Sequence, residues 1–185
     1  IPMKSSVNRY LLLALGLAVL FHGTAVFYTI EKTYDALIHL FFAEHYASNW
    51  QEPWSFKWYT GFSVMGYPPL VHQSLAILSF IGGFKFALFS YSFIVIIIFI
   101  TGVYRFSVLI TQNEDYAGFA AVFSVFSSVF VDTLHLFGQL PTLTGISLLM
   151  HSFPEIYKWI RTREWRYLVS SILLMSLMIC SHHVT

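Results

Sequence analysis

The chain has 185 residues, of which 57% are hydrophobic and only 10% are charged. Soluble domains carry roughly a quarter charged residues, so this composition excludes a soluble monomer, which would expose large apolar patches. It also excludes a disordered chain, which needs low hydrophobicity and high charge. A net charge of +1 gives no reason to expect a nucleic-acid partner. The composition predicts a polytopic integral membrane protein in contact with membrane lipid.

Charge-poor intervals predict helices near the length of about 20 residues that a membrane crossing needs. They are residues 10–30, 86–108, 116–133, 136–153 and 167–183. The period-2 alternation of a transmembrane barrel is absent, so the expected fold is an all-α transmembrane bundle. It forms a single membrane domain over residues 1–185. Because the chain stops at the edge of an apolar span, the sequence predicts the N-terminal part of a longer protein.

The apolar stretch 70–83 leaves the number of spans at five or six. A stretch this short often lies in the membrane interface or re-enters the membrane. With five spans and a cytoplasmic N-terminus, seven of the ten Lys and Arg residues are cytoplasmic, whereas only three are cytoplasmic if 70–83 crosses. The positive-inside rule therefore favours five crossings, with the N-terminus in the cytoplasm.

Under this topology residues 31–69 form an extracytoplasmic loop. Residues 35–49 place apolar side chains at helical spacing and predict an amphipathic helix on the membrane surface. Aromatic residues follow, among them Trp54, Trp58 and Tyr67. Their rings are candidates for stacking on sugar rings or prenyl chains. The alternative is an aromatic belt at the level of the lipid headgroups.

Asp35 and His39 are four residues apart, so they share one face of the predicted helix. A carboxylate in this position orients an imidazole, or the two side chains together bind a cation. The alternative is an Asp that stabilises the start of the helix through the helix dipole, beside an interfacial His. Glu44 and His45 follow on the same helix and extend a candidate set of ligands for a divalent metal ion.

Polar groups at the ends of the later spans reach the same outer side under the five-crossing topology. Those taken as candidates for substrate binding are Asp132, His135, Gln139, His182 and His183. Ionisable groups at membrane depth are costly, so they are functional candidates by default. On the cytoplasmic side the sequence predicts only a solvated basic loop at 155–166.

Four short motifs occur along the chain in a fixed order. They are EKTYD at 31–35, Asp35-x3-His39, YPPL at 67–70 and GQLP at 138–141, followed by a span that ends in histidine. In this order they resemble the N-terminal part of GT-C-type integral membrane glycosyltransferases. Among these, the chain looks closest to the prokaryotic membrane proteins described as 6-pyruvoyl-tetrahydropterin-synthase-related.

The resemblance implies transfer of a sugar from a polyprenyl-phosphate-linked donor, outside the cytoplasm and at a prokaryotic plasma membrane. It implies that Asp35 is the base that takes a proton from the acceptor hydroxyl, or that Asp35 helps to bind a divalent metal ion. It also makes His72 the only nearby candidate for contact with the donor phosphate. The Asp-x-Asp and Asp-Glu forms of some relatives are absent from this sequence.

Two functions of other classes remain open. The eight histidines, with Asp35, allow a membrane metalloenzyme. The abundant aromatic residues also allow a non-catalytic subunit that binds or scaffolds other membrane subunits.

Overall fold

Helices dominate residues 8–182, the part of the chain that the computed structural model describes. They are α1 (Arg9–Ala18), α2 (Thr24–Thr29), α3 (Ala36–Ser48), α4 (Leu70–Thr111), α5 (Glu114–Val125), α6 (Ser128–Val131), α7 (Leu140–Thr162) and α8 (Trp165–Ser181). Between α3 and α4, strand β1 (Trp54–Ser55) pairs antiparallel with β2 (Phe62–Ser63). The predicted helical class is confirmed, with one small hairpin that the residue pattern did not predict.

The first predicted span, residues 10–30, lies within one continuous helix, Arg9–Lys32, which is long and apolar enough to cross a membrane. A π-helical turn at Val19–Gly23 joins α1 to α2 within it. At its start the Asn8 side chain accepts hydrogen bonds from two backbone N–H groups of the first turn. This cap satisfies donors that a helix leaves without intrahelical partners.

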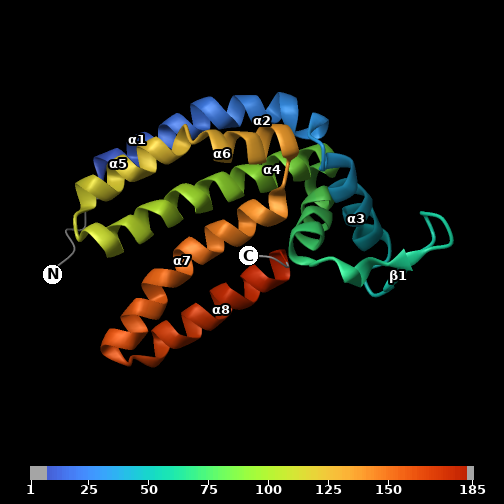
Figure 1. Cartoon of the computed structure of the whole chain (residues 1–185). Helices are drawn as coiled ribbons and strands as arrows, with labels where there is room; N and C mark the ends of the chain where they lie inside the picture. The colour runs from blue at the N-terminus through green and yellow to red at the C-terminus, as the bar shows by residue number, and fades with distance from the viewer. Residues whose placement is uncertain (1–7, 183–185) are drawn as a thin grey trace.

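The long helix α4 is broken at Gly82 and Gly83. Gly83 has a φ of +79°, a left-handed conformation that glycine adopts without steric cost. Before the break, segment 70–81 packs against α3 through His72 and Ala76. After the break, the helix runs between α5 and α7. The break sets the short apolar stretch apart from the rest of α4, at the same end of the bundle as α3 (Figure 1).

The predicted loop at 155–166 is wrong, because α7 continues through Pro154 to Thr162. Arg163 ends the helix in a left-handed conformation, with a φ of 58°, and its N–H bonds the carbonyl of Trp159. The density of charge in this stretch favours a loop on hydropathy alone. In the structure residues 155–162 are helical, and Glu155 forms ion pairs with Arg105 of α4 and with Lys158 on its own helix.

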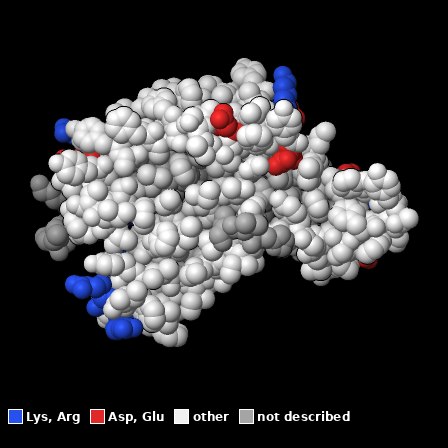
Figure 2. Space-filling view, viewed as in Figure 1, with Lys and Arg blue, Asp and Glu red and all other residues white. Residues whose placement is uncertain are grey.

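Helix α4 lies at the centre of the bundle, with α1, α5 and α6 on one side and α7 and α8 on the other (Figure 1). Its side chains Leu88, Ile96 and Ile100 are fully buried there. One end of the bundle carries α3 and the hairpin, and the opposite end carries the turn between α7 and α8. Figure 2 shows Lys and Arg side chains gathered around that turn.

Among the described residues, two helices are long and apolar enough to cross a membrane, Arg9–Lys32 and Leu70–Thr111. A third crossing is possible if α5 and the segment Ser128–Phe137, which are bent by 48° from each other, count as one span. Helix α8 is apolar but shorter, with 17 residues. The structure is thus consistent with the predicted integral membrane protein.

Candidate functional site

Asp35 lies between the first long helix, Arg9–Lys32, and the start of α3. Its backbone N–H donates to the carbonyl of Phe137 at 3.0 Å, and the N–H of Tyr34 donates to Leu136 at 3.2 Å. These bonds tie the start of α3 to the end of the π-helical turn Asp132–Phe137. The side chain is half-buried. Among the described residues its carboxylate has no hydrogen-bond or ion-pair partner, so it is available to a ligand.

His39, one turn further along α3, is buried against His72. Its Nε2 lies 2.9 Å from the carbonyl of Gly138, and because a carbonyl only accepts, Nε2 carries the proton. Its Nδ1 therefore accepts the hydrogen bond from His72 Nε2 at 3.1 Å. Burial lowers the pKa of His39, and the Gly138 carbonyl and the Asp35 carboxylate oppose that shift. The ring is thus neutral near pH 7 and fixed in one tautomer.

Aromatic rings surround His72 on its other sides. The Phe42 ring centroid lies 4.8 Å away and the Tyr67 centroid 5.2 Å away. Burial, and secondarily the Asp35 carboxylate, raise the pKa of Tyr67. His72 itself is fully buried, so in this arrangement it supports His39 and does not present a surface to a donor phosphate. Asp35, His39, Tyr67 and His72 are the predicted site residues that the structure brings together.

Gly138 closes this site with a left-handed backbone, φ +69°, and its carbonyl holds His39. A Cβ at this position would overlap the Thr33 hydroxyl. We expect Gly138→Ala to lower the free energy of unfolding by roughly 1–3 kcal/mol, because a strained backbone and a clash add up. Thermal unfolding in micelles measures this change. Gly16→Ala is the control, since a Cβ there meets nothing within 4 Å; an equal loss in both variants would contradict the assignment.

The predicted metal ligands on α3 are engaged separately. Glu44 forms an ion pair with Lys57 at 3.1 Å on the surface. His45 Nε2 donates to the backbone carbonyl of Glu52 at 2.7 Å. Within residues 8–182 no group of three His, Cys, Asp or Glu side chains converges on a point that would hold a metal ion. These donors do not converge, and the predicted metal ion stays a prediction.

The aromatic candidates Trp54 and Trp58 lie on the hairpin, away from Asp35, and both are exposed. Trp58 packs against Phe41 and Phe62, with ring centroids 6.2 and 6.1 Å apart. The hairpin projects beyond α3 (Figure 1), so these rings belong to a separate surface.

The predicted site residues from the later spans lie at several different places in the structure. Asp132 is exposed at the start of the π-helical turn. His135 pairs with His22 at 2.9 Å, with their rings stacked, and is part of the packing between helices. Gln139 directly precedes α7 next to Gly138. His182 lies 3.4 Å from the Thr142 hydroxyl, and the predicted His183 falls outside the described residues.

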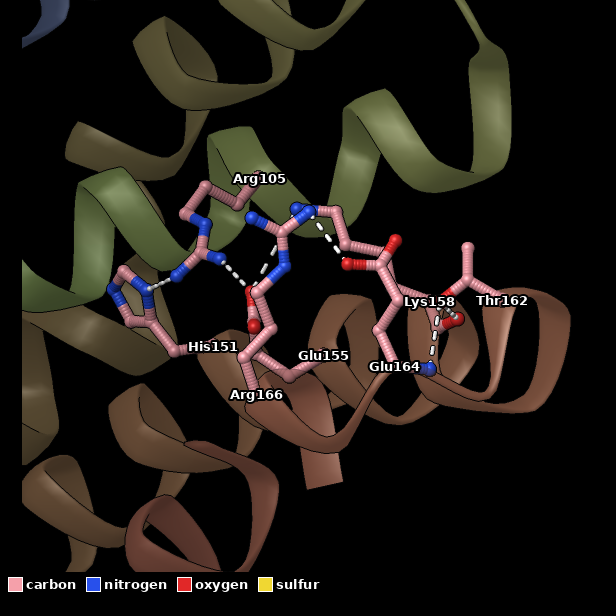
Figure 3. Close-up of polar contacts among 7 residues, drawn as sticks. All are labelled: Arg105, His151, Glu155, Lys158, Thr162, Glu164 and Arg166. Atoms are coloured by element: carbon pink, nitrogen blue, oxygen red, sulfur yellow. Dashed lines mark hydrogen bonds and ion pairs between the residues drawn. The ribbon is translucent and has the colours of Figure 1, made fainter. Parts of the chain in front are cut away.

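The structure also contains a partly buried ionic network that sequence reasoning missed (Figure 3). Arg105 of α4 donates to His151 Nδ1 at 2.8 Å and forms an ion pair with Glu155 of α7. His151 Nε2 donates to the carbonyl of Ile98 at 2.9 Å, which fixes its tautomer. Glu155 is only 7% exposed. The available signal was an acid within a stretch otherwise rich in basic residues.

Comparisons with protein-family models, with curated proteins and with solved structures find no match for this chain. The resemblance to GT-C-type enzymes therefore depends on the order of the short motifs alone.

Proposed function

We propose that this chain is a GT-C-like membrane glycosyltransferase, or the N-terminal module of one, which uses a polyprenyl-phosphate-linked sugar on the extracytoplasmic side. The observation that carries the proposal is Asp35. It is a half-buried carboxylate without a partner among the described residues, held by backbone bonds at the bundle end beside a neutral, fixed His39. An acid at the membrane face that no neighbouring group neutralises is a functional candidate by default.

In the proposed reaction Asp35 is the general base. It takes the proton of the acceptor hydroxyl as that oxygen attacks the anomeric carbon of the donor sugar. The bond from the anomeric carbon to the phosphate oxygen breaks, and polyprenyl phosphate leaves with the electron pair. His39 lies four residues further along the chain, and its ring is neutral. It therefore does not neutralise the Asp35 carboxylate by forming an ion pair with it.

The five-crossing topology is part of the proposal. Three observations support it: the break at Gly82 and Gly83, the packing of segment 70–81 on α3, and the basic side chains at the bundle end opposite α3. Under this topology Asp35 faces the extracytoplasmic side, and the N-terminus and the turn between α7 and α8 face the cytoplasm. Cysteine-accessibility labelling at Thr162 tests it, since external labelling would contradict five crossings.

The activity is tested with the full-length protein in proteoliposomes. A panel of polyprenyl-phosphate hexoses with radiolabelled sugar is supplied together with candidate saccharide acceptors, and the release of polyprenyl phosphate is measured. The proposal expects protein-dependent release from at least one donor. No release from any donor, with a stable co-purified membrane partner instead, would favour the alternative of a non-catalytic subunit.

A further inference from the structure

An open cavity of about 190 Å³ lies between the end of α3, the loop that follows it and the start of α4. The side chains of Tyr46, Trp50, Glu52 and Gln73 are among those that line it. At ~30 Å³ per water, this volume equals about six waters, so it holds one small ring and no chain. None of the predicted site residues lines it.

Among the described residues that line the cavity, Tyr46 carries a polar atom without a hydrogen-bond partner, and that atom is closed off from solvent. Tyr46 is buried, and its hydroxyl makes no hydrogen bond among the described residues. Burial also raises the pKa of Tyr46, so the hydroxyl keeps its proton and remains a donor. A buried hydroxyl without a partner costs about 1–3 kcal/mol, which is why such groups in native proteins usually have a ligand, a water or a functional role.

The wall of the cavity is held in place by contacts that do not depend on a ligand. His45 Nε2 donates to the carbonyl of Glu52 at 2.7 Å, and Val64 N–H donates to the carbonyl of Pro53 at 2.9 Å. The ring of Trp50 meets that of Tyr46 edge to face, with centroids 5.9 Å apart. His45, predicted as a metal ligand, thus positions the loop that shapes this cavity. A site fixed before binding loses less conformational entropy when a ligand enters.

The chemistry of the lining selects the class of ligand. The amides of Gln51 and Gln73 both donate and accept hydrogen bonds, as the hydroxyls of a sugar do. The Trp50 ring supplies an apolar face for the C–H side of such a ring. Among the described residues that line the cavity there is no Lys, Arg or His, so nothing there attracts a phosphate. An ammonium ligand would use Trp50 and Glu52 but would leave both amides without a role.

We propose that this cavity binds a neutral monosaccharide unit of the acceptor, at a distance from the reacting hydroxyl. Tyr46 follows Asp35 by eleven residues on α3, about 16 Å along the helix at 1.5 Å per residue. A general base acts only within hydrogen-bond reach, so the bound unit is not the one that reacts. Binding of a remote part of the substrate helps to position the reacting part. The identification of the ligand as an acceptor depends on the proposed function.

The test uses the full-length protein in nanodiscs of phosphatidylethanolamine and phosphatidylglycerol, because maltoside detergents and choline lipids would compete for the cavity. The probes are neutral disaccharides and trisaccharides of glucose, galactose, mannose and N-acetylglucosamine, with tetramethylammonium and inorganic phosphate as comparison ligands. Saturable binding is followed by tryptophan fluorescence and by the ligand-induced shift in Tm.

Tyr46→Phe is the most informative variant, since it gives opposite effects with and without ligand. We expect it to raise Tm in the absence of ligand, because a buried unpartnered hydroxyl is removed, and to weaken saccharide binding about three- to tenfold. Trp50→Ala is expected to weaken binding tenfold or more. The matched controls Tyr59→Phe and Trp165→Ala change exposed residues elsewhere and are expected to bind as the wild type does.

The outcomes separate this inference from the proposed function. Asp35→Asn should bind saccharides normally while losing transfer, and Tyr46→Phe should raise KM for the acceptor more than it lowers kcat. Saccharide binding without any transfer would overturn the proposed function alone. Transfer with no saturable saccharide binding, binding unchanged in both Tyr46→Phe and Trp50→Ala, or binding of tetramethylammonium alone would overturn the cavity assignment.

Discussion

Replacing Asp35 with Asn is expected to lower kcat for sugar transfer by about 10²–10⁴-fold, the range that a general base contributes. The amide keeps the size of the side chain but cannot take a proton from the acceptor hydroxyl. The carboxylate has no hydrogen-bond or ion-pair partner among the described residues, so the change leaves no other group unpaired. We therefore expect the unfolding temperature to stay within a few degrees of the wild-type value.

The control for this variant is Asp115→Asn. Asp115 is an exposed acid in the first turn of α5, where its carboxylate accepts a hydrogen bond from Asn8. Both variants are measured in the same proteoliposome assay, as initial rates over a range of donor concentrations. Turnover by Asp35→Asn at the wild-type rate would overturn the catalytic assignment, and an equal loss in Asp115→Asn would show that the effect is not specific to the site.

The arrangement around Asp35 could be predicted in part, because it combines local and topological rules. The spacing of Asp35 and His39 places them on one helix face, and the order of the spans brings residues 138–139 to the same end of the bundle. The structure contains both features. The burial of His72 and the bond from His45 to Glu52 could not be predicted, because each depends on how a loop and a helix meet in space.

The end of α7 shows why charge alone is an ambiguous signal. Glu155 and Lys158 fall where hydropathy ends a span, and the sequence gives no local reason to prefer a helix there. The helix continues through this point, and Glu155 meets Arg105, which is 50 residues earlier in the chain and on a different helix. Sequence periodicity describes one segment at a time, so it does not identify such a partner.

Removing Arg105 from this network is expected to have the largest effect on stability. In Arg105→Leu the nearly buried Glu155 carboxylate keeps only Lys158, at 3.7 Å, as an ion-pair partner within residues 8–182. Loss of one partner of a buried ion pair costs about 3–5 kcal/mol, and because the Arg105 side chain is 37% exposed we expect roughly 2–4 kcal/mol. Denaturant unfolding in mixed micelles measures the difference.

The double variant Arg105→Leu/Glu155→Leu should regain at least half of that loss. The cost comes from a carboxylate left without its partner, and an apolar pair of similar size removes that carboxylate. Lys57→Met is the control, since Lys57 and Glu44 form an exposed pair worth less than about 1 kcal/mol. Suppose that the double variant loses as much free energy of unfolding as Arg105→Leu and Glu155→Leu lose together. The network then acts through packing and not through charge. Recovery would instead show that the ion pair makes α4 and α7 dependent on each other at the bundle end opposite Asp35.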